Sequence, residues 1–238
     1  MAEGFENRAA DWIRFARTEG HDAYWTYRDS FFELLPSAPA AVLEVGCGEG
    51  RVARDLRARG YEVTGLDVAT TLVQAARDAD PSGTYLVGDA AALPFGDASF
   101  DLVVSYNSLI DVEDMPAAIA EASRVLRPSG YFCACVPHPF SDAGEFTSND
   151  PDAAFVVEGS YLQEGDYELV SERNGIVFHF VSRRFPLESY ANALERAGFA
   201  IEALREPPLP GVDRHRRRRI PVFLLWRAVK RLDTRPSG

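Results

Sequence analysis

A turn with a glycine at every second position follows an apolar segment near the start of the chain. The stretch AVLEVGCGEGRVARDL spans residues 41–56, and its glycines are Gly46, Gly48 and Gly50. Glycine lets a backbone approach a bound molecule closely and point free N–H groups at it. A carboxylate, Glu44, precedes the first glycine by two residues. The combination predicts a ligand site at the end of a strand.

Three classes of ligand compete for such a turn. A triphosphate-binding loop ends in Gly-Lys-Ser/Thr, whereas here Arg51 and Val52 follow the last glycine. A dinucleotide fingerprint is G-x-G-x-x-G, and the two carboxylates Glu44 and Glu49 would repel a diphosphate. For a sulfonium nucleoside with a free amino group the interaction is attractive instead of repulsive, because a carboxylate attracts both of its cationic groups. The turn therefore favours S-adenosylmethionine.

Two more carboxylates follow the next two predicted strands. Asp67 lies 17 residues after Gly50, near the spacing at which an acid binds ribose hydroxyls in nucleotide-binding sheets. Asp89 follows the third strand, where its carboxylate would accept a hydrogen bond from an adenine amino group. Any one acid could instead cap a helix. Because parallel strands end at one sheet edge, we expect Glu44, Asp67 and Asp89 to lie together there.

Short apolar segments alternate with amphipathic ones from residue 41 onward. The expected strands are 41–45, 60–67, 84–89, 100–106 and 131–137, and the expected helices are 49–59, 69–78 and 114–127. Continuous apolar strands are typical of a sheet covered on both faces, and strand-helix-strand order gives right-handed crossovers. The pattern predicts an α/β fold with a parallel sheet and helices on both of its faces.

The flanking regions have other patterns. Residues 6–35 predict two helices rich in aromatic side chains, and 139–160 is a Gly/Asp/Ser-rich connection. Residues 167–185 predict a β-hairpin that turns near Asn174-Gly175. The remaining expected elements are a helix over 186–198 and strands over 199–206 and 220–229.

Composition limits the class of protein. The 238 residues are 46% hydrophobic, which suits one globular domain. No run of 18 apolar residues and no secretory leader is present, so we expect no membrane span and a cytoplasmic location. The cysteines Cys47, Cys133 and Cys135 lack metal-ligand spacing, which predicts reduced thiols and no metal site.

Four motifs together resemble the class I S-adenosylmethionine-dependent methyltransferases, and within them the methyltransferase type 11 group. They are VLEVGCGEGRVARDL, VTGLDVA, GDAAALPFGDASFDLVVSYNSLIDVEDM and EASRVLRPSGYF, in that order over residues 41–136. The last third of the chain matches loosely, through AGF and RIPVFLLWRAVK. The resemblance implies a Rossmann-like seven-stranded sheet whose last strand runs antiparallel between its neighbours, with an N-terminal helical lid and a hairpin insertion after the fifth strand.

The resemblance also implies one methyltransferase domain over 1–238. Its parts would be a helical lid (1–38), a cofactor-binding core (41–136), a substrate-cap insertion (139–185) and a C-terminal helix with the last two strands (186–238).

The site residues that the resemblance implies begin with Gly46 and Gly48 at the methionine part of the cofactor. Asp67 would take the ribose, Asp89 and Ala90 would face the adenine, and Tyr106 and Asn107 would lie near the methyl sulfur. The full predicted cofactor-binding set is Glu44, Gly46, Cys47, Gly48, Asp67, Val68, Asp89, Ala90, Tyr106 and Asn107.

Methyl transfer from a sulfonium requires alignment of the acceptor and exclusion of water, and a base helps where the acceptor is a hydroxyl or a protonated amine. His138, between Pro137 and Pro139 after the fifth strand, is the first candidate base, with a turn role as the alternative. Asp111, after the fourth strand, is the second, although it could merely begin a helix. Many relatives have a histidine at this position, so the role of that histidine does not carry over directly.

An apolar acceptor pocket is expected under the lid and the hairpin. Its predicted lining is Tyr24, Trp25, Tyr161 and Phe178, although aromatic packing alone would also explain each of them. Residues 1–213 carry 16 basic against 35 acidic side chains, a balance of −19 that disfavours an acidic polymer as substrate. The run RHRRRR at 214–219 is either a phosphate contact or a loop that pairs with the acidic body.

These observations predict an enzyme that transfers a methyl group from S-adenosylmethionine to a small molecule, such as a specialised metabolite, and releases S-adenosylhomocysteine. The acceptor atom could be oxygen, nitrogen or carbon, and the protein a monomer or a homodimer. Two alternatives stay open. One is a cyclase or isomerase that binds S-adenosylmethionine without methyl transfer, and the other is an RNA methyltransferase that uses residues 214–219.

Overall fold

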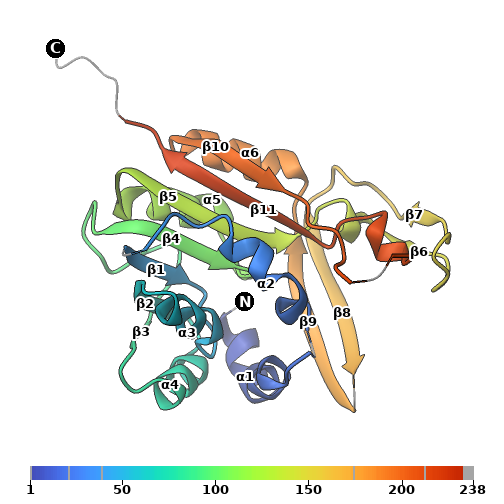
Figure 1. Ribbon diagram of the computed structural model, residues 1–238, viewed down its shortest axis with the longest axis horizontal. Helices are drawn as coiled ribbons and strands as arrows, with labels where there is room; N and C mark the ends of the chain where they lie inside the picture. The colour runs from blue at the N-terminus through green and yellow to red at the C-terminus, as the bar shows by residue number, and fades with distance from the viewer. Residues whose placement is uncertain (1, 21, 39, 174, 212, 233–238) are drawn as a thin grey trace.

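The computed structural model describes residues 2–20, 22–38, 40–173, 175–211 and 213–232. A seven-stranded sheet with the order β10-β11-β5-β4-β1-β2-β3 forms its centre (Figure 1). The strands are β1 (Ala41–Val45), β2 (Glu62–Asp67), β3 (Thr84–Val87), β4 (Phe100–Tyr106), β5 (Leu126–Pro137), β10 (Phe199–Arg205) and β11 (Phe223–Lys230). Strands β3, β2, β1, β4 and β5 pair in parallel, and β11 is antiparallel to both β5 and β10. The predicted fold class is confirmed, including the antiparallel last strand between its neighbours.

Helices cover both faces of this sheet, because the side chains of each buried strand alternate between two apolar cores. The helices are α1 (Ala2–Arg17), α2 (Tyr24–Phe32), α3 (Arg51–Ala58), α4 (Thr70–Ala79), α5 (Met115–Val125) and α6 (Leu187–Arg196). Leu102 and Val104 of β4 pack with α2, α3 and α4, whereas Val103 packs with α5 and α6. None of the helices in the described part of the chain is long and apolar enough to cross a membrane.

The segment after β4 reaches α5 through a single turn of 3₁₀ helix, η1 (Leu109–Asp111). Helix α5 begins at Asp114, whose carboxylate accepts a hydrogen bond from the Ala117 backbone N at 3.0 Å, and a proline stands in its first turn. On sequence grounds Asp111 could begin this helix, but Asp114 caps it instead. The Asp111 side chain is therefore available for another contact.

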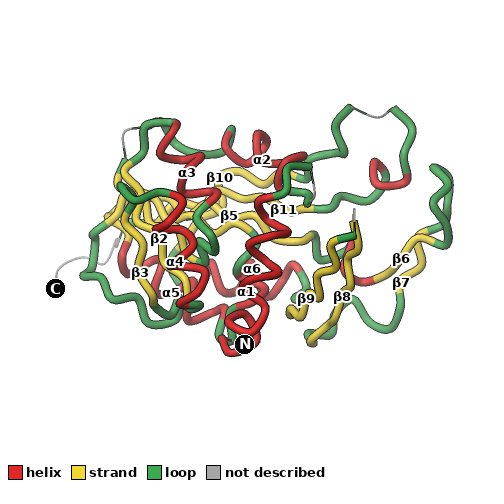
Figure 2. The backbone as a smooth tube through the Cα atoms, turned by 90° about the horizontal axis from the view of Figure 1, so that it is seen from below, coloured by secondary structure: helices red, strands yellow, loops and turns green. Residues whose placement is uncertain are grey.

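Two small antiparallel hairpins lie beyond one end of the sheet (Figure 2). The larger one, β8 (Gly165–Arg173) with β9 (Ile176–Arg184), confirms the predicted hairpin. Gly175 in its turn has a φ of +74°, and Asn174 lies outside the described residues. Helix α1 packs on β9 through aromatic rings, with the Trp12 and Phe178 centroids 5.3 Å apart.

The smaller hairpin corrects the expectation of a connection without strands over 139–160. Strands β6 (Gly144–Phe146) and β7 (Phe155–Val157) pair there, after a 3₁₀ turn η2 (Ser141–Ala143). Each strand has three residues, which is too short for an alternating pattern to be recognised in a sequence.

The arginine run at 214–219 binds this insertion. Arg214 forms an ion pair with Asp152, and an Arg219 guanidinium nitrogen donates to the Ala153 backbone oxygen at 2.6 Å. A 3₁₀ turn, η3 (Arg216–Arg218), lies within the run. The pairing with the acidic body that the loop interpretation expected is therefore present.

The three cysteines are free thiols and all are buried. Burial raises the pKa of each thiol, so the reactive thiolate form is disfavoured at neutral pH.

Truncation of a central strand residue should destabilise the fold much more than the same truncation at the surface. Leu102 in β4 is fully buried, so Leu102→Ala is expected to lower the free energy of unfolding by about 2–5 kcal/mol through the cavity it leaves. Leu162 is 74% exposed, and Leu162→Ala should stay within about 0.5 kcal/mol of the parent protein. Urea unfolding followed by circular dichroism measures both, and equal midpoints for the two variants would contradict this account of the core.

Candidate functional site

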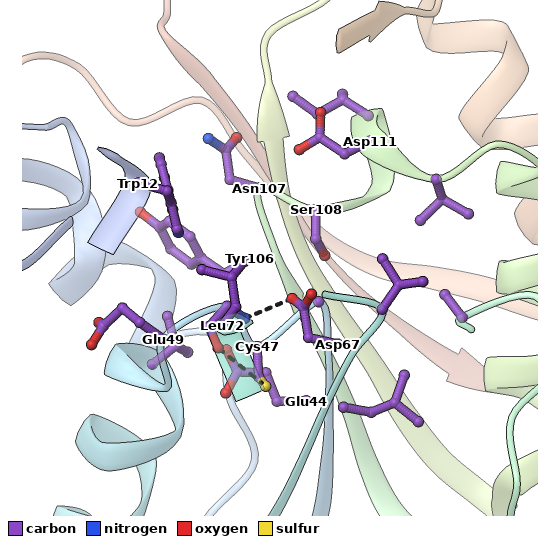
Figure 3. A pocket seen from close by; sticks show the side chains of 18 of the residues that line it. Trp12, Glu44, Cys47, Glu49, Asp67, Leu72, Tyr106, Asn107, Ser108 and Asp111 are labelled. Carbon is purple, nitrogen blue, oxygen red and sulfur yellow. Dashed lines mark hydrogen bonds between the residues drawn. The ribbon is translucent and has the colours of Figure 1, made fainter. Parts of the chain in front are cut away.

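A cavity lies against the turn between β1 and α3 (Figure 3). Its space free of atoms is about 1240 Å³, which includes open solvent at the mouth. Gly46 and Gly48 line it with φ angles of +72° and +53°. A Cβ on Gly46 would lie 2.3 Å from the Ser108 Cβ, and a Cβ on Gly48 would lie 3.2 Å from the Trp12 Nε1. The turn therefore needs glycine to pass between these side chains.

Glu44 lies near the end of β1, two residues before Gly46, and is 1% exposed. Its Oε2 has no hydrogen-bond partner among the described residues. Burial, and then the nearby charges of Asp67 and Glu49, hold the pKa of its carboxyl well above the ordinary range. A buried carboxyl in this condition would be stabilised by a cationic group bound in the cavity.

Glu49 is equally buried, but its carboxylate is paired with two arginine side chains. Arg17 Nε donates to its Oε2 at 2.9 Å, and an Arg54 guanidinium nitrogen contacts the same oxygen at 2.8 Å. The two guanidinium groups compensate the charge of Glu49. The attraction for a cationic ligand that the sequence analysis assigned to both acids therefore falls mainly to Glu44.

Asp67 at the end of β2 is joined to the glycine turn. Its Oδ2 accepts a hydrogen bond from the Gly48 backbone N at 2.8 Å, and its Oδ1 accepts one from the Ala69 backbone N at 2.9 Å. Burial raises the pKa of this carboxyl, and those backbone hydrogen bonds oppose the rise. Each carboxylate oxygen can accept a second hydrogen bond, as binding of two ribose hydroxyls would require.

The end of β3 supplies a third wall of the same cavity. Val68, Asp89 and Ala90 line it together. The Asp89 carboxylate is exposed and accepts a hydrogen bond from the Ala91 backbone N at 2.9 Å, which fixes its direction. All ten residues predicted to bind the cofactor line this one cavity.

The end of β4 places Tyr106, Asn107 and Ser108 along the cavity (Figure 3). Asn107 has a φ of +59°, a left-handed conformation that asparagine tolerates better than most residues. Its Oδ1 is buried without a hydrogen-bond partner among the described residues. Buried oxygens are almost always paired in folded proteins. Three lining residues, Glu44, Tyr106 and Asn107, thus have a buried oxygen without a partner among the described residues, which fits a ligand rich in N–H and O–H donors such as S-adenosylmethionine.

Asp111 lies on η1, above Asp67 and Glu44 in Figure 3. Its Oδ1 accepts a hydrogen bond from the Ser182 hydroxyl of β9 at 2.7 Å. Burial raises the pKa of Asp111 to about 7, although the Ser182 hydrogen bond and the charge of Arg8 act in the opposite direction. A carboxyl with this pKa changes protonation near neutral pH, as a general base must.

Aromatic side chains close the cavity on the side of α1 and the hairpin. Trp12, Phe178 and Phe180 line it, and the Phe178 and Phe180 rings lie 4.7 Å apart. Arg51, the first residue of α3, connects this cover to the glycine turn: its guanidinium pairs with Asp22 at 2.6 Å and lies 5.3 Å from the Trp12 ring.

Of the four residues predicted to line the acceptor pocket, Phe178 lines the cavity. Tyr24 packs behind it, with its ring 5.2 Å from the Tyr106 ring and its hydroxyl donating to Asp55 at 2.6 Å. Trp25 packs edge-on against Tyr24. The Tyr161 hydroxyl accepts a hydrogen bond from the Leu187 backbone N at 3.1 Å. For these three residues a role in acceptor binding stays a prediction.

His138 is placed outside the cavity lining. Its Nδ1 accepts a hydrogen bond from the Phe140 backbone N at 3.1 Å, so the proton of the neutral ring lies on Nε2, which contacts Glu206 at 2.8 Å. Both ring nitrogens are thus engaged in the turn after β5. Of the two bases predicted from the sequence, Asp111 is the one that lines the cavity, and a catalytic role for His138 stays a prediction.

Sequence reasoning missed many of the lining residues, among them Trp12, Arg51, Ser108, Phe180 and Ser182. Two of them had a usable signal, since Phe180 and Ser182 alternate with the predicted Phe178 along one face of the hairpin. No group of three or more metal-ligating side chains occurs among the residues that the structure describes.

Comparisons with known proteins agree with this geometry. The family described as "Methyltransferase domain" matches residues 43–134. A malonyl-[acyl-carrier protein] O-methyltransferase from Salmonella typhimurium is 36% identical over 131 residues, which cover 55% of this chain and 50% of that protein. A demethylmenaquinone methyltransferase from Beutenbergia cavernae is 34% identical over 112 residues, 47% of this chain and 46% of that one. The chain spans about half the length of these relatives.

A solved structure extends the likeness over the whole fold. An S-adenosylmethionine-dependent methyltransferase from Mesorhizobium loti superposes with a TM-score of 0.71 and 27% identity, and the match covers 87% of this chain and 98% of that one. Residues matched by the family line the cavity, and the likeness to the solved structure covers more of the chain than the family match does. Residues 43–134 therefore match the methyltransferase domain family, and the chain has the fold of the class I S-adenosylmethionine-dependent methyltransferases.

Proposed function

We propose that this protein transfers the methyl group of S-adenosylmethionine to a small organic acceptor that loses a proton in the reaction, such as a hydroxyl or amine of a specialised metabolite. The observation that carries the proposal is Asp111, a carboxyl whose pKa is about 7, in the wall of the cavity that the cofactor residues line. An acceptor with a removable proton matches a base that is ready at neutral pH.

The cofactor would be held by the glycine turn and by the acids at the strand ends. Glu44 and Asn107 would offer buried oxygens to an amino group, Asp67 would offer its carboxylate to ribose hydroxyls, and Asp89 lines the same cavity. When bound, S-adenosylmethionine supplies a methyl group on a positively charged sulfur, a leaving group that needs no further activation.

The residues of this chain would then align the acceptor, exclude water and receive its proton. Above a pH of about 7, the Asp111 carboxylate is available as the proton acceptor, consistent with the raised pKa of its side chain. The rings of Trp12, Phe178 and Phe180 give the acceptor side an apolar cover that would keep bulk water from the reacting atoms. Positioning supplies much of the rate enhancement in a displacement of this type.

The charges in the cavity favour a neutral or cationic acceptor. Glu44, Asp67, Asp111 and Glu113 all line it, and an acceptor carboxylate would be repelled wherever they are ionised. The two relatives are named for different acceptors, malonyl-[acyl-carrier protein] and demethylmenaquinone, so neither name selects an acceptor for this chain. In the arginine run, Arg214 and Arg219 bind the insertion. These contacts use guanidinium groups that an RNA methyltransferase would need for phosphates, which disfavours the RNA alternative.

A screen with S-adenosylmethionine labelled in its methyl group tests the function. The protein should incorporate label into small molecules of a metabolite extract and form S-adenosylhomocysteine in equal amount. Conversion of an acceptor without S-adenosylhomocysteine would favour a cyclase or isomerase instead. Label recovered in RNA, with salt-sensitive binding that is lost when residues 214–219 become glutamine, would favour the RNA alternative.

Loss of the Asp67 charge should weaken cofactor binding. Asp67→Asn is expected to raise the Kd for S-adenosylhomocysteine at least about tenfold, because charged hydrogen bonds to the ribose would be lost. Isothermal titration calorimetry measures the Kd. Asp101→Asn is the matched control, since Asp101 accepts the Ala41 backbone N at 2.9 Å at the other end of β1, outside the cavity lining. An unchanged Kd in the Asp67 variant would refute its role.

Turnover of the acceptor found in the screen should rise with pH through the titration of Asp111, with a midpoint near its pKa of about 7. Asp111→Asn should lower kcat at pH 8 by about 10²–10⁴-fold and leave the Kd for S-adenosylhomocysteine within about twofold, because it removes only the proton acceptor. His138→Ala is measured in parallel. Full activity in the Asp111 variant with loss in the His138 variant would transfer the role of base to His138.

The same variant has a stability signature. The folded-state pKa of Asp111, about 7, is raised above the unfolded value, so its ionisation opposes folding as pH rises through that range. Asp111→Asn should therefore have a Tm at pH 8 at least as high as the parent protein. A lower Tm at pH 8 would mean that the ionised carboxylate stabilises the fold.

A further inference from the structure

Strand β9 presents alternate side chains to the cavity. Phe178, Phe180 and Ser182 line it, because residues two apart on a strand point to the same side. Two of these side chains are apolar rings, and Ser182 is the polar one. It is 3% exposed, so its hydroxyl is removed from bulk water.

The Ser182 hydroxyl interacts with Asp111 and also with the Tyr167 phenol. Its Oγ donates to Asp111 Oδ1 at 2.7 Å, which joins two positions that are 71 residues apart in the chain. A short hydrogen bond from a buried hydroxyl to a buried carboxylate stabilises the ionised form and fixes the orientation of the carboxyl plane. The contact also connects η1, next to the cofactor residues of β4, with the hairpin that covers the acceptor side.

The other titratable groups that act on Asp111 come from four elements. Arg8 of α1 favours the ionised carboxylate, and Asp67 of β2 opposes it. Tyr167 of β8 stands opposite Ser182 in the hairpin register, and Tyr190 belongs to α6. Burial raises the pKa of both phenols, with the Asp111 charge as a smaller cause, so they stay neutral at the pH where Asp111 titrates.

We propose that Ser182 is a positioning residue that anchors the Asp111 carboxyl, so that the hairpin β8–β9 and the proposed base form one unit. The inference rests on the proposed role of Asp111 in methyl transfer. A hairpin seated in this position orients the carboxyl toward the acceptor side of the cavity and keeps it ionised at lower pH. A displaced hairpin releases the carboxyl, which then holds its proton more tightly.

The test compares Ser182→Ala, which removes the hydroxyl, with Ser182→Thr, which keeps it. Ser123→Ala is the matched control, because Ser123 is also buried but lies on α5, away from the cavity lining. Ser182→Ala should raise the pKa of Asp111 by about 1 unit, the usual effect of losing a hydrogen bond to a charged group. Ser182→Thr and Ser123→Ala should each leave that pKa within about 0.3 units of the parent value.

The first readout needs no acceptor. Carbon NMR of aspartate labelled at its carboxyl carbon reports the Asp111 titration directly, with Asp111→Asn to assign the signal. The second readout is the midpoint of the kcat profile against pH. If Ser182→Ala fails to fold, Ser182→Cys keeps the shape with a weaker donor and should shift the pKa in the same direction.

The two readouts separate the inference from the function on which it rests. An upward shift of both the NMR titration and the kcat midpoint supports it, with recovery in Ser182→Thr. An Asp111 pKa that is the same in Ser182→Ala and Ser123→Ala overturns it, whatever the kinetics. An NMR shift without a kcat shift supports the anchoring contact while it refutes Asp111 as the base.

Discussion

The site depends on one electrostatic constraint: parallel strands deliver their carboxyl ends to the same edge, and this chain places an acid at several of them. Glu44, Asp67 and Asp111 share one poorly hydrated cavity, where like charges interact more strongly than they do in water. Burial is the main cause of the raised pKa of all three carboxyls, and the charge of Asp67 adds to the rise at Glu44 and at Asp111. Such an arrangement persists because it binds a ligand with positive charge.

The fold compensates these acids unequally, and the differences give each a distinct role. Glu49 is matched by two guanidinium groups and becomes part of the framework. Asp67 is held by two backbone N–H groups, which fix its direction and still leave acceptor capacity. Asp111 receives one hydroxyl. Glu44 keeps an oxygen with no partner among the described residues, and it is therefore the acid that depends most on the ligand.

All ten residues that the sequence predicted for the cofactor line the cavity, because each of them lies within a few positions of a strand end. The register of Glu44, Asp67 and Asp89 follows from local pattern and from the rule that parallel strands share an edge. The acceptor side could not be predicted in the same way. Ser182 meets Asp111 across 71 residues, and Trp12 reaches Gly48 from a helix that precedes the sheet. Those contacts depend on how the hairpin and α1 pack, which no local pattern encodes.

The same distinction explains the histidine. His138 follows a strand at the same edge of the sheet, and sequence position alone made it the first candidate base, ahead of Asp111. The glycine turn follows β1, and β4 is the neighbour of β1 in the sheet. His138 follows β5, which lies one strand further away, on the other side of β4. At that distance the two prolines and the Phe140 N–H engage the ring in a turn. The strand order, together with the order along the chain, decides which strand ends meet.

The position of β11 has a consequence for synthesis. The last described strand of the chain lies between β5 and β10, so the edge strand β10 leaves the ribosome before the strand that connects it to the sheet. The nucleoside half, β1 to β5, can assemble during translation, whereas β10 can join the sheet only after residues 223–230 have been made. A nascent chain would therefore expose the apolar flank of β5 until its final segment is inserted.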